Sequence, residues 1–146
     1  MQHNQFIGES FFIKEPIIFN KFSPKEVLQF CLGATLYMPG TKDIIDKIYS
    51  KTYNSLTSLV MCLEDAIQEK DVTKAELNIL SHLDSIQGKI ESGEFSIDDV
   101  PLIFIRVRNP SQFVTFSESL TPELANVLTG FVFPKFHLGN ALDYLD

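Results

Sequence analysis

Four short apolar runs constrain this fold more than any other feature of the sequence. Apolar residues fill nearly every position of each run, which indicates strands buried on both faces, as in a parallel sheet covered on its two sides. The runs are ATLYM at 34–38, TSLVMCL at 57–63, LIFIRV at 102–107 and GFVFP at 130–134.

Helical patterns separate these runs. Apolar residues recur at helical spacing from Val72 to Ile90, and Gly93 is expected to end that helix. Four shorter segments carry helix signals. A capping box at 23–26, with Ser23 as the cap, begins a helix that Gly33 is expected to end, and Thr41 is expected to cap a short helix through 42–50. The stretch between the third and fourth runs has room for short helices, one with a capped start at Thr121, and Asn140 is the expected cap of the helix that follows it.

The alternation of strand and helix predicts an α/β fold of parallel (β/α) units. Four such units are about half of a (β/α)₈ barrel of ~250 residues. We therefore expect the first four strands of a TIM-type barrel, incomplete in this sequence. Residues 1–33 are expected to form an N-terminal extension with a capped helix, and 34–146 the first half of the barrel domain.

Composition excludes several classes of partner. A formal net charge of −7 disfavours nucleic acid and anionic membranes, because both are bound by clustered cations. Cys31 and Cys62 each lie in an apolar stretch, which favours buried thiols in a reducing compartment. The apolar N-terminal stretch is too short and too interrupted by charges for a signal peptide or a spanning helix. We expect a cytoplasmic protein.

Polar residues follow each predicted strand. Ligands of parallel α/β proteins bind at the carboxyl ends of the strands, and burying an unpaired charge would cost several kcal/mol, so an apolar run that stops on two acids indicates a polar rim. The first strand ends in a bare turn that a ligand can approach. The candidate site residues are Pro39, Gly40, Glu64, Asp65, Arg106, Arg108 and Lys135.

Each of these residues also has an ordinary explanation. Acids after a strand commonly cap a helix or lie in a solvated loop. Arg106 and Arg108 share a face at period two and are compatible with surface ion pairs, and Lys135 is compatible with a solvated lysine. Their occurrence at successive strand ends favours a shared site.

The strand ends together resemble a known family. The segments LYMPGTK, LVMCLEDAI, FIRVRNP and GFVFPKF are similar to the first four strand motifs of the citrate lyase beta subunit and HpcH/HpaI aldolase family of magnesium-dependent carbon–carbon lyases. The longer segments ATLYMPGTK and SLVMCLEDAI resemble those of the branch associated with tellurite-resistance and stress gene clusters.

The resemblance implies a barrel enzyme in which a divalent metal binds a keto acid, or a 3-hydroxy acid or acyl thioester, and stabilises an enolate during retro-aldol or retro-Claisen cleavage. Arg106 would bind the substrate carboxylate, with Arg108, Lys135, Pro39 and Gly40 as further substrate contacts. Glu64 and Asp65, which match the "LEDA" acids, would lie beside the magnesium without ligating it directly.

The sequence departs from the family in two places. Gly33-Ala34-Thr35 stands where relatives carry an arginine, which leaves the use of CoA open, and Arg108 replaces an asparagine, which leaves open whether Arg106 or Arg108 faces the site. The family's metal-ligating glutamate and aspartate lie on the fifth and sixth strands, beyond Asp146. Glu64 and Asp65 are adjacent and are expected to point to opposite faces, so they cannot replace that pair. We expect this polypeptide alone to be inactive.

Two other readings remain. Open sheet edges predict self-association or a partner chain that covers them, so a non-catalytic α/β interaction or binding module paired with another subunit is the main alternative. A flavodoxin-like domain is disfavoured, because MPGTK provides no glycine-rich phosphate loop after the first strand.

Overall fold

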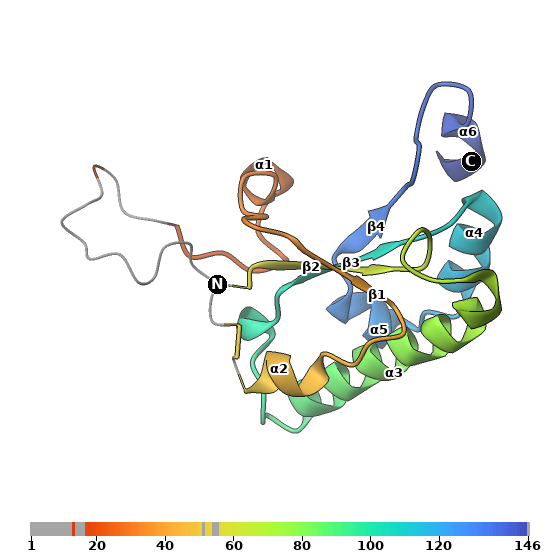
Figure 1. The fold of residues 1–146 in the computed structure, drawn as a ribbon. Helices are drawn as coiled ribbons and strands as arrows, with labels where there is room; N and C mark the ends of the chain where they lie inside the picture. Colours follow the sequence, from red (N-terminus) through yellow and green to blue (C-terminus); the bar gives the residue numbers. More distant parts are fainter. Residues whose placement is uncertain (1–12, 14–16, 51, 54–55, 146) are drawn as a thin grey trace.

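A four-stranded parallel sheet forms the centre of the molecule (Figure 1). The computed structural model describes residues 13, 17–50, 52–53 and 56–145. The strands are β1 (Leu36–Pro39), β2 (Ser58–Cys62), β3 (Leu102–Arg106) and β4 (Gly130–Val132), in the sheet order β1-β2-β3-β4. Each strand pairs with its neighbour in the chain, which is the arrangement of a barrel wall. The predicted α/β fold with four parallel strands is confirmed.

The register brings the carboxyl ends of the strands together. Pro39 pairs with Cys62, Cys62 with Arg106, and Arg106 with Val132. The residues that follow each strand therefore lie along one rim of the sheet.

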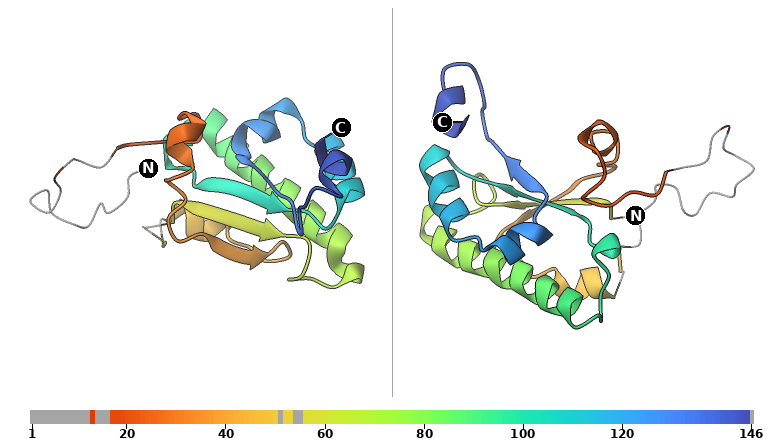
Figure 2. Two further views of the ribbon diagram at one scale, coloured as in Figure 1. Left: turned by 90° about the horizontal axis from the view of Figure 1, so that it is seen from above. Right: turned by 180° about the vertical axis from the view of Figure 1, so that it is seen from behind.

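Most helices cover a single face of the sheet, as the two further views in Figure 2 show. They are α2 (Ile45–Tyr49), α3 (Val72–Glu91), α4 (Pro110–Glu118) and α5 (Pro122–Val127). The long helix α3 contributes Ile79 and Leu83, both fully buried, to the core that it forms with Leu59 of β2 and Ile105 of β3. Fully burying one such side chain contributes about 1.5–3 kcal/mol, so this packing fixes the sheet against α3.

The opposite face of the sheet has a thinner cover. The short helix α1 (Lys25–Leu28) and its flanks pack Phe19 and Cys31 against Leu102 of β3. Buried faces on both sides were predicted for all four strands; β2 is fully buried, but β1 and β4 are only half-buried because helices cover one face. In a closed barrel this second face would be the interior.

Two of the predicted helix caps are wrong. The Ser23 hydroxyl accepts from the Asn20 N–H at 3.1 Å, so α1 has no side-chain cap and ends at Leu28 instead of at Gly33. Thr41 does not cap α2; Asp43 Oδ1 accepts from the Ile45 N–H at 3.0 Å. At the first site the Ser23 hydroxyl is bonded within its own turn, and at the second Asp43 accepts in place of Thr41.

The remaining helix predictions fare better. Helix α3 covers the predicted stretch and is followed by Gly93 at φ 75°, and the Thr121 hydroxyl caps α5 by accepting from the Leu124 N–H at 3.3 Å. Asn140 precedes α6 (Ala141–Leu145), but its side-chain oxygen accepts from the His137 N–H, so it serves the preceding turn instead of capping the helix.

Two further observations concern the chain as a whole. Both cysteines are buried and free, as predicted. Within the described part of the chain, no helix is both long and apolar enough to cross a membrane.

Candidate functional site

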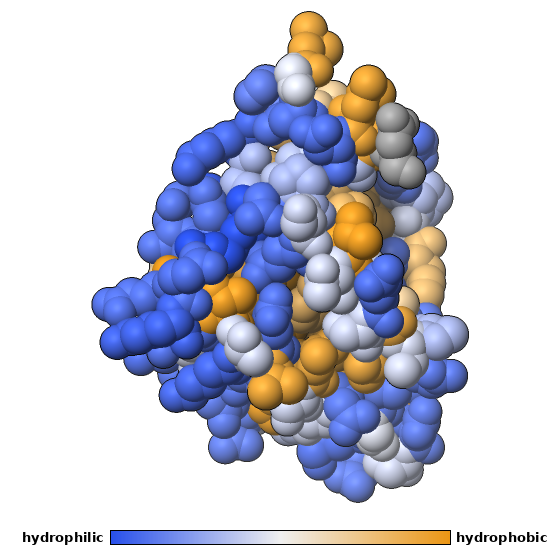
Figure 3. Space-filling model, turned by 90° about the vertical axis from the view of Figure 1, so that its right-hand side faces the viewer, coloured by the Kyte–Doolittle hydropathy of each residue, from blue (hydrophilic) through white to orange (hydrophobic). Residues whose placement is uncertain are grey.

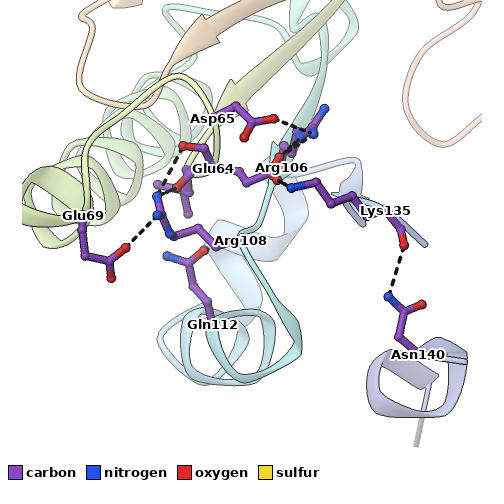
Figure 4. Close-up of polar contacts among 9 residues, drawn as sticks. Glu64, Asp65, Glu69, Arg106, Arg108, Gln112, Lys135 and Asn140 are labelled. Carbon is purple, nitrogen blue, oxygen red and sulfur yellow. Dashed lines mark hydrogen bonds and ion pairs between the residues drawn. The ribbon is translucent and has the colours of Figure 1, made fainter. Parts of the chain in front are cut away.

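Glu64 is the centre of the rim (Figure 4). It lies just after β2 and is only 7% exposed. Its Oε2 accepts from Arg106 Nε at 2.7 Å and also contacts Arg106 Nη2, while its Oε1 lies 3.2 Å from Lys135 Nζ. Both carboxylate oxygens therefore face cations, which is why an acid can be buried here.

The two cations keep Glu64 ionised. Burial raises the pKa of the Glu64 carboxyl, but the hydrogen bonds and charges of Arg106 and Lys135 outweigh it and hold that pKa below its usual value. Burial lowers the pKa of Arg106 and Glu64 raises it, with a net rise. Glu64 is thus a carboxylate at neutral pH and orients the guanidinium.

Arg106 is the last residue of β3 and points away from the helical layer. Ile103 and Ile105 face the helix-side core, so alternation along the strand places Arg106 on the opposite face. Its side chain is 25% exposed. The guanidinium is held yet open to a ligand in solution.

Asp65 reaches the same guanidinium as Glu64. Its Oδ2 lies 3.4 Å from Arg106 Nη2, and its side chain is 73% exposed. The prediction that the two acids point to opposite faces is wrong, because β2 ends at Cys62 and the alternation of a strand no longer applies to them.

Lys135 has an unusual backbone conformation. Its φ is 50°, in the left-handed region, which costs a non-glycine residue roughly 1–2 kcal/mol. The carbonyl of Lys135 accepts from Asn140 Nδ2 at 3.2 Å, and its side chain is 78% exposed. This turn aims the ammonium at Glu64.

Aromatic rings support the segment that carries Lys135. Phe133 stacks on Tyr144 of α6 with ring centroids 4.3 Å apart, and Phe113 of α4 meets Phe133 edge-on at 5.0 Å. Such pairs contribute about 0.5–1.5 kcal/mol beyond their buried area. They tie the chain after β4 to both helices.

Pro39 and Gly40 end the first strand. Gly40 is buried, and its N–H donates to the Cys62 carbonyl at 2.8 Å. A Cβ at this position would lie 3.0 Å from Ile79 Cδ1 and 3.2 Å from Ala75 Cβ, so the glycine permits the close approach of α3. The structure gives Gly40 a packing role, and the predicted substrate contacts of Pro39 and Gly40 stay predictions.

Arg108 lies at the same rim but binds the protein itself. Its Nη1 donates to the carbonyls of Leu63 at 3.0 Å and Glu64 at 3.3 Å, and its Nη2 lies 2.7 Å from Glu69 Oε2. Its backbone N–H donates to Gln112 Oε1 at 2.7 Å.

Sequence reasoning missed Glu69 and Gln112. The Asn109-Pro110 pair is a helix start, and an N-cap bonds to the N–H two or three positions later, here that of Gln112 at 2.9 Å. That signal could have placed Gln112 beside the rim.

The described residues do not by themselves fit a magnesium site. Among them no group of three or more histidines, cysteines, aspartates and glutamates could hold a metal ion. Both oxygens of Glu64, the buried acid of the rim, face Arg106 and Lys135. We derive no step through a metal.

Parallel (β/α) units in chain order, with an acid–arginine pair at the carboxyl rim, are the arrangement of part of a TIM-type barrel. Residues 26–146 match the family described as C-C bond lyase of the TIM-barrel fold, and the chain belongs to this family. Comparison with curated proteins gave no match, and comparison with solved structures gave none.

Proposed function

We propose that this rim binds the carboxylate of a small keto acid, or of a related 3-hydroxy acid or acyl thioester, for carbon–carbon bond cleavage of the citrate lyase beta and HpcH/HpaI aldolase type. Membership of a C-C bond lyase family supports the reaction class. The observation that carries the proposal is the Arg106 guanidinium, which buried Glu64 orients while a quarter of the side chain stays exposed.

The charges of the rim favour an anionic ligand. Arg106 and Lys135 bring two positive charges to the single buried carboxylate of Glu64, and the side chain of Asp65 is 73% exposed and 3.4 Å from Arg106. A ligand carboxylate that displaces Asp65 from Arg106 would balance the second positive charge of this group. Burial of the ligand would then strengthen its attraction to the guanidinium.

The donors of Arg106 are divided in a way that suits this task. Among the described residues, the acids contact its Nε and Nη2, which leaves Nη1 for a ligand. A planar guanidinium with one edge fixed presents its other donors in a defined direction, and a lysine ammonium lacks this geometry. Arg106 would orient the substrate, and Lys135 would supply the second cation.

Magnesium dependence belongs to the same proposal, with ligands from outside the described residues. A covering chain or further strands over the second face of the sheet are also proposed, because a barrel wall encloses that face. The face of the molecule that carries the strand ends has hydrophobic side chains among hydrophilic ones (Figure 3).

A non-catalytic interaction module is the second candidate. Aromatic side chains on the α1 side favour it: Phe30 is 80% exposed, Phe22 59% and Tyr37 of β1 52%. Exposed apolar groups of this size are common where another chain packs.

The test is a binding titration of the full chain with pyruvate and oxaloacetate, followed by calorimetry or NMR. We expect Arg106→Lys to weaken binding by more than tenfold, because the fork is lost while the charge remains. Methyl pyruvate, which lacks the carboxylate, is the matched ligand control, and Lys25→Arg, at an exposed position of α1, is the protein control. Equal affinity for pyruvate and methyl pyruvate, or an unchanged affinity in Arg106→Lys, would refute the proposal.

A further inference from the structure

We propose that Arg108 is a positioning residue: it holds the chain after β2 so that the Glu64 carboxylate stays against Arg106. The inference rests on the function proposed for the rim, and it replaces the substrate contact that the sequence suggested for Arg108.

The contacts of Arg108 fix the peptide on which Glu64 depends. The Leu63 N–H donates to the carbonyl of Arg106 at 2.9 Å, and the Leu63 carbonyl accepts from Arg108 Nη1 at 3.0 Å. The same Nη1 lies 3.3 Å from the Glu64 carbonyl. The backbone is therefore held on both sides of Leu63 and again at Glu64.

Arg108 is itself anchored to two helices. Its backbone N–H donates to Oε1 of Gln112 in α4, and Gln112 Nε2 donates to Oε1 of Glu76 in α3 at 2.9 Å. Gln112 is 9% exposed, so this connection is largely protected from water. The anchor ties the position of Arg108 to helices that pack under the sheet.

Most hydrogen-bond donors of the Arg108 guanidinium already have partners within the protein. Its Nη1 serves the two carbonyls, and its Nη2 lies 2.7 Å from Glu69. One planar group thus joins a backbone turn and an acid, which a single ammonium cannot do with the same geometry. The two arginines divide the work at the rim: Arg106 faces the ligand and Arg108 supports Glu64.

The test measures the position of Glu64 directly. In the full chain, ¹³C NMR of the Glu64 carboxyl gives its pKa, and the Arg106 Nε–H resonance reports its hydrogen bond to Oε2. We expect Arg108→Met to move the Glu64 pKa toward the ordinary 4.5 and to speed solvent exchange of the Arg106 Nε–H by at least tenfold. Pyruvate binding should weaken about tenfold, because the Arg106 guanidinium would no longer be pre-organised for the ligand carboxylate.

Two further variants distinguish the hydrogen-bonding geometry of Arg108 from its charge. Arg108→Lys keeps the charge without the fork and should also release the Arg106 Nε–H, whereas Glu69→Gln, at a side chain 83% exposed, should leave both signals unchanged. If Arg108→Met does not fold, Arg108→Lys decides alone. Unchanged Glu64 and Arg106 signals in a folded Arg108 variant overturn the inference. These signals do not depend on a ligand, so a wild-type chain that binds no keto acid refutes the proposed function separately.

Discussion

Replacing Glu64 by glutamine tests whether the rim depends on a buried carboxylate. Glutamine keeps the shape and one acceptor oxygen, but its amide group would direct donors at the Lys135 ammonium. Glu64→Gln therefore loses the charge that two cations share and part of the hydrogen bonding to Arg106.

The expected loss in free energy of unfolding depends on how exposed each partner of Glu64 is to water. A hydrogen bond to a charged group contributes about 1.5–3 kcal/mol, which is the appropriate scale for the contact between Glu64 and Arg106, since Glu64 is 7% exposed. The Lys135 side chain is 78% exposed, so water screens its ion pair to about 0–1 kcal/mol. We expect Glu64→Gln to lower the free energy of unfolding by about 2–3 kcal/mol at neutral pH.

The penalty should depend on pH in a fixed direction. Since the folded-state pKa of Glu64 is below its usual 4.5, its stabilisation is complete above pH 4.5 and is lost as the pH falls through the lowered value. Below that range the wild-type chain should approach the stability of Glu64→Gln.

The assay is urea unfolding followed by far-UV circular dichroism at pH 7 and near pH 3. Asp65→Asn is the matched control, because Asp65 is 73% exposed and 3.4 Å from the same guanidinium, so it should cost below about 1 kcal/mol. Equal costs for the two variants, or a Glu64→Gln deficit that is the same at both pH values, would refute the reasoning.

Two other substitutions test residues that follow the first and fourth strands of the rim. Gly40→Ala should destabilise the chain by about 1–3 kcal/mol in urea unfolding, because its Cβ would lie 3.0 Å from Ile79 Cδ1 and 3.2 Å from the Cys62 carbonyl; a neutral effect would show that α3 can shift. Lys135→Gly should change the free energy of unfolding by less than about 1 kcal/mol, because relief of the left-handed backbone offsets the lost ion pair. The same variant should weaken pyruvate binding in the titration, and unaltered binding would remove Lys135 from the proposed site.

The sequence predicts the sheet and the meeting of Glu64, Arg106 and Lys135 for the same reason. Short apolar runs separated by helical segments specify parallel strands, and parallel strands in chain order bring their carboxyl ends to one rim. Polar residues at those ends or just past them then lie close together. Neither step depends on the last residue of any strand.

The details that failed do depend on such boundaries. Glu64 and Asp65 reach the same guanidinium because β2 ends at Cys62, before the alternation of a strand could separate them. The caps failed because the hydrogen bonds of each turn depend on its local geometry: Asp43 accepts from the Ile45 N–H, and the Ser23 hydroxyl accepts from the Asn20 N–H. The role proposed for Arg108 rests in part on a hydrogen bond from its backbone N–H to Gln112 of α4, which no periodicity encodes.

The order of the strands also sets an order of assembly during synthesis. Each strand pairs with the one made just before it, so the sheet can grow as the chain leaves the ribosome. Glu64 gains Arg106 only when the chain 42 residues further on has emerged, and Lys135 emerges just after β4. Until then the Glu64 carboxylate is expected to stay in water, because burying it without a cation is costly. We therefore expect the carboxyl end of the unfinished sheet to become buried only after Arg106 has emerged.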